Sequence, residues 1–221
     1  MPDNRPTPVV LLHGAGMMPT MWQSQVEALG AERRAIAPWI AGLRPGRRFE
    51  LSLRTASAEV IGTLDGSGYA KAALVAHQLG AMVALQAAAD HPERIDRLVV
   101  SGATLLPGKL ALRLQKAAIR VMPAARLAQT GATKDDLVKA LDVMAEADFS
   151  QRLGEIVPPT LVIVGQGDDL DARRVRIARL ASECGCLLRL VGRRSRGQGN
   201  PPVRTSGRCA ARNGFRLQEC R

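Results

Sequence analysis

Short apolar runs that alternate with helical patterns limit the possible folds of this chain more than any other feature. The run at residues 9–12 ends in a His-Gly-Ala-Gly loop at residues 13–16, and a helical pattern follows. The run at residues 72–76 leads at once into a helical pattern over about residues 79–90. Continuous apolar runs of this length are typical of strands buried on both faces of a parallel sheet. The sequence therefore predicts an α/β fold, with a mostly parallel sheet and helices on both faces.

The remaining strands and helices follow from the same two periodicities. Further strands are predicted at residues 34–37, 97–101, 160–164 and 187–191, and further helices at residues 57–64 and 172–181. Pro19 opens the helix after the glycine loop, where Thr20 and Gln23 have the spacing of a capping box. A length of 221 residues is within the range of one domain.

Residues 107–155 interrupt this alternation with two helical patterns and no strand. Pro123 and Gly131 separate the two patterns. Thr133 and Asp136 predict a capping box at the start of the second helix. The apolar face of that helix consists of Leu137, Val138, Leu141 and Met144. The sequence therefore predicts an all-helical insertion between two strands of the sheet.

The first helix of the insertion is cationic on one side and apolar on the other. Its basic residues are Lys109, Arg113, Lys116 and Arg120, and its apolar residues are Leu110, Leu114, Ala117 and Val121. Such a helix can lie on a membrane surface. It can instead cover a pocket with its apolar face and leave its charges in water. The place of the helix inside an insertion favours the second interpretation.

The positive charge of the chain is concentrated at its C-terminal end. The formal net charge is +11, but residues 184–221 hold nine Arg and one acid and supply +8 of it. The first 183 residues are nearly neutral, at +3. All four Cys also lie in this tail, and their spacing matches no common zinc site. We therefore expect no metal and no cofactor, and nucleic acid is an unlikely partner of the nearly neutral body.

Three interpretations of the tail at residues 191–221 are open. A reading-frame shift in a GC-rich gene would add Arg, Gly, Pro and Cys at one point and end the hydrophobic periodicity, as happens after about residue 181. A natural divergent tail would have the same composition and would be disordered. A selected Arg-rich tail would bind nucleic acid through phosphate contacts.

The sequence predicts a soluble, cytoplasmic protein without stable membrane association. No apolar run approaches the roughly 18 residues that a membrane-spanning helix needs. The N-terminus lacks the basic and then apolar pattern of a signal peptide.

Four segments, in this order along the chain, resemble the α/β-hydrolase superfamily. They are VVLLHGAG at residues 9–16, LVAHQLGAMVAL at 74–85, HPERI at 91–95, and PTLVIVG at 159–165 with Asp168. The resemblance covers about residues 8–190. It implies the α/β-hydrolase fold, with a core over residues 1–190 and a small helical cap at about residues 104–155 over the active site. By this resemblance the chain is related to enzymes that hydrolyse small esters or similar bonds.

The nucleophile of that superfamily is missing from the motif that should carry it. The family pattern Gly-x-Ser-x-Gly makes a sharp strand-to-helix turn, the nucleophile elbow. Here the five positions read Ala-His-Gln-Leu-Gly at residues 76–80, so Gln78 takes the place of the serine. A carboxamide has no proton that a base could remove to make an attacking alkoxide. The oxyanion hole depends on backbone N–H groups, and the resemblance implies that Ala15 and Leu79 supply them.

Of the other two members of a catalytic triad, the acid has a candidate in this sequence and the histidine has none. The resemblance implies Asp168 as the acid, although this carboxylate and its acidic neighbours can equally cap the following helix. The family histidine lies on a loop after the last strand, and no His follows His91 in this chain. We interpret His13 as a brace for the oxyanion loop, His77 as part of the elbow and His91 as the end of a helix.

These observations predict a hydrolase-family protein with little or no hydrolytic activity. One alternative is a non-catalytic protein that binds a small apolar or ester-like molecule and uses the carboxamide of Gln78 for a hydrogen bond. Another is an enzyme of different chemistry in the same pocket, in which Gln78 holds a substrate or a water molecule. Neither the identity of the ligand nor the oligomeric state follows from the sequence.

Overall fold

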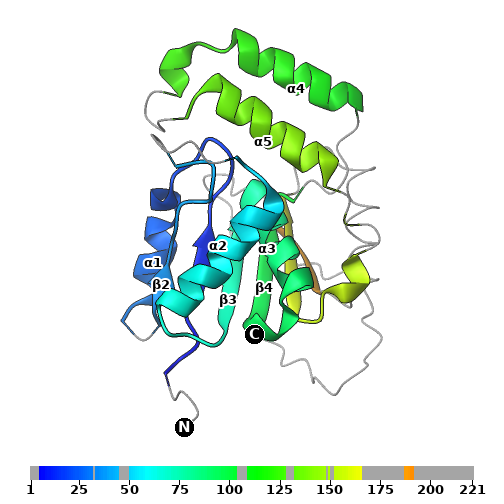
Figure 1. Ribbon diagram of the computed structural model, residues 1–221. Helices are drawn as coiled ribbons and strands as arrows, with labels where there is room; N and C mark the ends of the chain where they lie inside the picture. The colour runs from blue at the N-terminus through cyan, green and yellow to red at the C-terminus, as the bar shows by residue number, and fades with distance from the viewer. Residues whose placement is uncertain are drawn as a thin grey trace.

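A six-stranded parallel sheet forms the centre of the molecule in a computed structural model (Figure 1). The structure describes residues 5–31, 33–44, 50–103, 109–127, 132–147, 149, 152–165 and 187–191. The strands are β1 (Val9–Leu12), β2 (Ala35–Ile36), β3 (Ala72–His77), β4 (Ile95–Ser101), β5 (Thr160–Gly165) and β6 (Leu187–Val191). Every neighbouring pair is parallel, which confirms the predicted sheet and its last strand.

The direction in which strands are added to the sheet reverses between β1 and β3. The order is β2-β1-β3-β4-β5-β6, so the chain leaves β1 toward one edge and then crosses back to form β3 on the other side. In open parallel sheets, ligands bind beyond the carboxyl ends of the strands where the direction of strand addition reverses. The topology therefore predicts a ligand-binding site at the loops that follow β1 and β3.

The two faces of the sheet have different covers. On one face, α3 (Leu79–Asp90) packs against β3 and β4, and α2 (Leu53–Gly66) packs against α3. On the other face, Val9 and Leu11 of β1 contact Trp22 in the short helix η1 (Pro19–Trp22), which precedes α1 (Gln23–Leu29). All four residues of β1 are buried, as expected for a strand covered on both faces.

The predicted capping box at Thr20 and Gln23 is wrong. Pro19 does begin a helix, but that helix is the 3₁₀ turn η1, and neither η1 nor α1 has a side-chain cap. Thr20 lies inside η1 and not in the extended backbone that a capping residue needs. The predicted strand at residues 34–37 is shorter than expected, and the predicted helix at residues 172–181 lies outside the described residues.

The helical insertion forms a layer beyond the carboxyl edge of the sheet (Figure 1). Its helices are α4 (Lys109–Val121) and α5 (Lys134–Glu146), and α5 lies between α4 and the body. The predicted capping box of α5 is confirmed, because Thr133 Oγ1 accepts a hydrogen bond from the Asp136 N–H at 3.1 Å. Met144 of α5 reaches the main core, and Leu141 packs with the buried Leu112 and Ile119 of α4.

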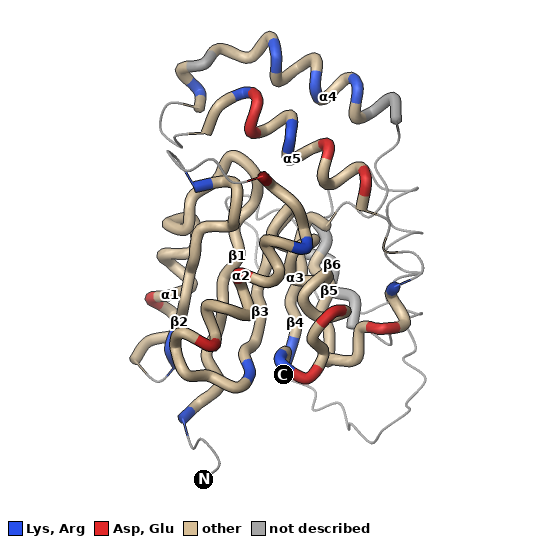
Figure 2. The backbone as a smooth tube through the Cα atoms, viewed as in Figure 1, with Lys and Arg blue, Asp and Glu red and all other residues tan. Residues whose placement is uncertain are grey.

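The orientation of α4 differs from the prediction that its apolar residues cover a pocket. Leu114 is 64% exposed and Val121 is 82% exposed, on the side away from α5. Leu112 and Ile119, which are two turns apart, face α5 instead, and Lys116 forms an ion pair with Asp142 of α5. These contacts fix the rotation of α4, and its other apolar stripe faces solvent. Figure 2 shows Lys and Arg along α4 but no acidic residue.

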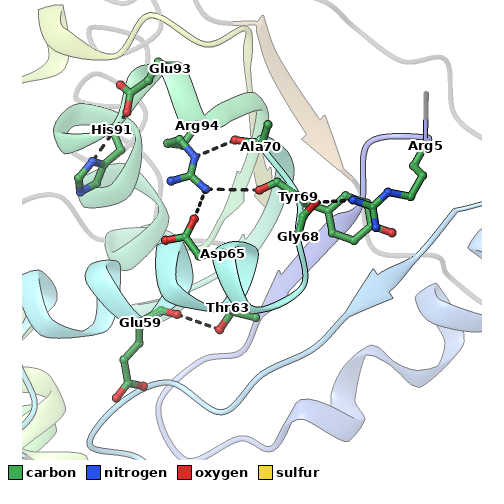
Figure 3. A network of polar contacts seen from close by, with 10 residues as sticks. All are labelled: Arg5, Glu59, Thr63, Asp65, Gly68, Tyr69, Ala70, His91, Glu93 and Arg94. Atoms are coloured by element: carbon green, nitrogen blue, oxygen red, sulfur yellow. Dashed lines mark hydrogen bonds and ion pairs between the residues drawn. The ribbon is translucent and has the colours of Figure 1, made fainter. Parts of the chain in front are cut away.

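An arginine ties three elements together at the opposite, amino-terminal edge of the sheet (Figure 3). Arg94, in the turn before β4, contacts the Asp65 carboxylate at 2.5 Å. It also donates to the carbonyl oxygens of Tyr69 and Ala70, at 3.3 and 2.7 Å. The Arg5 guanidinium stacks on the Tyr69 ring, 4.3 Å from its centroid. This network fixes the loop between α2 and β3 against the start of β4.

Replacing Arg94 should weaken the fold more than replacing a nearby exposed arginine. Arg94→Leu removes the donors to two backbone carbonyls, and we expect the free energy of unfolding to fall by about 1–2 kcal/mol. Arg97→Leu is the control, because the Arg97 side chain is 74% exposed and contacts only its neighbour Asp96 among the described ion pairs. Its effect should stay below about 0.5 kcal/mol. Urea unfolding followed by circular dichroism measures both, and equal losses would contradict the stabilising network.

Candidate active site

The turn between β3 and α3 has the geometry of a nucleophile elbow, with Gln78 at its tip. Gln78 has φ 49° and ψ −115°, and it is the non-glycine residue with positive φ among the described residues. Its N–H donates to the Ser101 carbonyl at 2.9 Å, and its own carbonyl accepts from the N–H of Ala81 at 3.0 Å. A strained backbone persists only where its surroundings fix it on both sides. The surroundings of Gln78 therefore hold a sharp strand-to-helix turn at this position.

Gly80 is the residue that lets the elbow approach the loop after β1. A Cβ atom at this position would lie 2.5 Å from the Leu12 carbonyl oxygen and 2.6 Å from that of His13. Both neighbours are backbone atoms, which cannot rotate away as a side chain would. The first turn of α3 therefore touches the end of β1 directly, and this contact brings Gln78 beside Gly14.

The carboxamide of Gln78 lies against the glycine loop. A Cβ atom at Gly14 would lie 2.6 Å from Gln78 Oε1 and 3.2 Å from Met17 Sδ. The loop is also covered from the cap, since a Cβ atom at Gly16 would lie 2.8 Å from Leu137 Cδ2 of α5. The Gln78 side chain therefore lies between the elbow and the glycine loop, and α5 of the cap covers the same loop at Gly16.

The backbone amides predicted to form an oxyanion hole belong to the two segments that meet here. Leu79 is the first residue of α3, so its N–H has no carbonyl partner within the helix. Ala15 follows Gly14 in a tight turn that the Met17 N–H closes on the Gly14 carbonyl at 3.2 Å. Positive electrostatic potential at a helix N-terminus favours a partial negative charge at this place.

His13 supports the loop from inside the protein. Its side chain is fully buried; Nε2 accepts the Ile40 N–H at 3.3 Å, and Nδ1 then donates to the Gly14 carbonyl at 2.9 Å. The Trp39 ring lies edge-on to the imidazole, with 5.2 Å between ring centroids. Burial lowers the pKa of His13 below its ordinary value, so the ring is neutral near pH 7. Both nitrogens are engaged with the backbone, in agreement with the predicted bracing role.

His77 and Ser101 form a second polar pair at the same edge of the sheet. They face each other in the register between β3 and β4, and His77 Nδ1 lies 3.0 Å from Ser101 Oγ. Ser101 is not among the site residues predicted from the sequence. Its place at the end of a predicted strand could have identified it, because the carboxyl ends of parallel strands meet at one edge. His91 is remote, since it ends α3, which is about 18 Å long, and lies 3.9 Å from Glu93 (Figure 3).

The predicted acid Asp168 and the tail at residues 192–221 lie outside the described residues. Within the described ranges, no cluster of three or more His, Cys, Asp or Glu side chains is placed to hold a metal ion. The structure thus brings together Gln78, Ala15 and Leu79 of the predicted site, with His13 beneath them.

Comparisons with known proteins agree on one family. The profile of the "Alpha/beta hydrolase family" matches residues 9–194. A Klebsiella pneumoniae (strain 342) protein named carbamate hydrolase RutD is 31% identical over 199 residues, and the match covers 73% of each chain. The solved structure of an alpha/beta hydrolase from a Medee basin deep-sea metagenome library has a TM-score of 0.72 at 17% identity, covering 87% of this chain and 83% of that one. An enol-lactonase from Burkholderia xenovorans LB400 has a TM-score of 0.66 at 19% identity, covering 85% and 83%.

Two glycine substitutions in helices should have opposite effects on stability. Gly80→Ala places a methyl group against two backbone carbonyls, and we expect a loss of about 2–3 kcal/mol. Gly62→Ala is the matched control within α2, because a Cβ atom there meets nothing within 4 Å. Alanine lowers the entropy of the unfolded chain, so Gly62→Ala should gain about 0.5–1 kcal/mol. Thermal unfolding of both variants measures the difference, and a neutral Gly80→Ala would refute the close approach.

The buried imidazole of His13 should make the protein less stable in acid. Because its folded pKa is below the ordinary value of 6.5, protons bind preferentially to the unfolded chain as the pH falls. The contribution of the neutral His13 ring to the free energy of unfolding is fully present above pH 6.5 and is lost progressively below it. Urea unfolding at about pH 8 and about pH 5 should show a smaller pH-dependent loss in His13→Gln than in the unmodified protein. The comparison of the two pH values separates titration from any general loss of stability, and identical slopes would argue against a neutral buried His13.

Proposed function

The chain belongs to the alpha/beta hydrolase family, and we propose that it binds a small ester-, amide- or carbamate-like molecule at the elbow without cleaving it through a covalent intermediate. The carbamate class is included because a relative at 31% identity is named a carbamate hydrolase. The observation that carries the proposal is Gln78 at the strained tip of the turn.

Covalent hydrolysis needs a nucleophile at this tip, and Gln78 does not supply one. An acyl-enzyme forms when an oxygen or sulfur of the protein attacks the carbonyl carbon and a base takes its proton. The carboxamide nitrogen of Gln78 is a very weak nucleophile because its lone pair is delocalised.

The chain also lacks an evident general base for such a step. The sequence contains three His, and none follows residue 91. Both ring nitrogens of His13 are engaged with the backbone, and His91 ends α3 far from the elbow. His77 Nδ1 lies against Ser101 Oγ. A catalytic histidine on the loop after β6, where the family carries it, has no counterpart in this sequence.

Binding does not need these side chains. The amides of Ala15 and Leu79 can donate to the carbonyl oxygen of an ester, amide or carbamate. The carboxamide of Gln78 offers both a donor and an acceptor, which matches the two hydrogen-bonding groups of an amide or a carbamate. A hydrogen bond in a partly enclosed site adds roughly 1 kcal/mol to binding, so one contact changes affinity about fivefold.

The first test is whether an acyl-enzyme forms. With p-nitrophenyl acetate, the unmodified protein should release no stoichiometric burst of p-nitrophenolate. Gln78→Ser should also give none, because a serine without a base stays a neutral alcohol, and only the residual acceleration of about 10³ to 10⁴ over water would remain. A burst from the unmodified protein that disappears in Gln78→Ala would overturn the proposal.

The second test is whether the elbow binds ligand, with ethyl carbamate as the probe. Gln78→Leu should weaken binding about fivefold in a chemical-shift titration for each hydrogen bond that the carboxamide makes to the ligand. Gln25→Leu is the control, since Gln25 is exposed on α1, away from the site. Equal affinities in the unmodified protein and Gln78→Leu would show that the elbow is not the binding site.

A further inference from the structure

An aliphatic stripe on the outer side of α4 has no partner among the described residues. The outer stripe consists of Leu114, Ala117 and Val121, each about one helical turn from the next on one side of the helix. Leu114 is 64% exposed, Val121 is 82% exposed and Ala117 is also exposed. Isolated exposed apolar residues are common, but three at helical spacing form a continuous surface.

The charges around the outer stripe have one sign. Arg113 and Arg120 each precede an aliphatic residue of the stripe by one position, so they flank it about 100° around the helix, and both are exposed. The sequence from residue 97 to residue 134 contains seven Lys and Arg and no Asp or Glu. Lys116 is already paired with Asp142 of α5, whereas Arg113 and Arg120 have no ion pair among the described residues.

The position of α4 leaves the outer stripe accessible to an extended, flat surface. Figure 1 shows α4 as the outermost element, beyond α5 and beyond the carboxyl edge of the sheet. The stripe is on the side away from α5, because Leu112 and Ile119 pack toward it. None of the described helices is long and apolar enough to cross a membrane.

We infer that the outer stripe of α4 docks the protein on a lipid surface that contains anionic headgroups. Leu114 and Val121 would enter the boundary between headgroups and acyl chains, while Arg113 and Arg120 bind lipid phosphates. An exposed aliphatic stripe beside exposed cations is the pattern of a helix that lies in the plane of a membrane. The sequence predicts that the apolar stripe of this helix covers a pocket, but Leu114 and Val121 face solvent instead.

Other occupants fit the outer stripe less well. A two-fold contact between copies of α4 would bring the arginines of one copy close to those of the other. Nucleic acid would use the arginines but leave the aliphatic side chains without a partner. Protein partners commonly bind through aromatic anchors, and α4 contains none.

The test measures binding of the full chain to vesicles of phosphatidylcholine, with and without phosphatidylglycerol. The unmodified protein should sediment with the anionic vesicles and much less with the neutral ones. The double variant Leu114→Gln and Val121→Gln should reduce binding about tenfold, because it removes the aliphatic contact. The double variant Arg113→Gln and Arg120→Gln should reduce it about fivefold for each arginine at low salt.

Val157→Gln provides the matched control, because Val157 is 76% exposed just before β5, away from the cap. It should bind anionic vesicles as the unmodified protein does. Binding that is unchanged in both α4 variants would overturn the inference and assign the attraction to the Arg-rich residues 184–221. If the protein ignores vesicles but sediments as a dimer that Leu114→Gln and Val121→Gln dissociate, the stripe is a contact between copies and the lipid proposal fails. Circular dichroism verifies that each variant is folded.

Discussion

The contact of Gly80 with the carbonyl oxygens of Leu12 and His13 is the constraint on which the candidate site depends. It allows the first turn of α3 to meet the end of β1, and so it places the elbow beside the glycine loop. Gln78 takes up the strain of this arrangement in its positive φ, and hydrogen bonds from both sides hold it there. His13 then supports the loop from the interior. The site is thus built by backbone packing before any side chain acts.

This dependence on backbone explains how family geometry and a non-family residue coexist. The turn, the helix N-terminus and the loop amides need small residues and close contacts, and they tolerate a change of the side chain at position 78. Nucleophilic catalysis needs one side-chain oxygen and one histidine, and a single substitution is enough to remove either of them. A family member can therefore keep its fold and its hydrogen-bond donors while the chemistry at the elbow changes.

The sequence predicted elements well where local pattern and burial agree. The limits of α3 at residues 79 and 90, the strand at residues 187–191 and the capping box of α5 are all found in the structure. The prediction from the sequence failed at Thr20, where the spacing matched a capping box but the chain forms a 3₁₀ turn. It failed again at α4, whose two opposite apolar stripes could each have faced the body. Periodicity identifies faces of a helix, but it does not choose between two of them.

The sequence by itself determined the parallel sheet, the place of the helical insertion between strands, and the presence of a carboxamide, Gln78, at the turn after β3. These follow from residue types and their spacing, which act locally. Only the tertiary structure decided that the Gln78 carboxamide lies against Gly14, that Ser101 meets His77, and that Leu114 and Val121 face outward. Each of these contacts joins segments far apart along the chain or depends on the rotation of a helix. Such contacts are set by packing across the whole molecule.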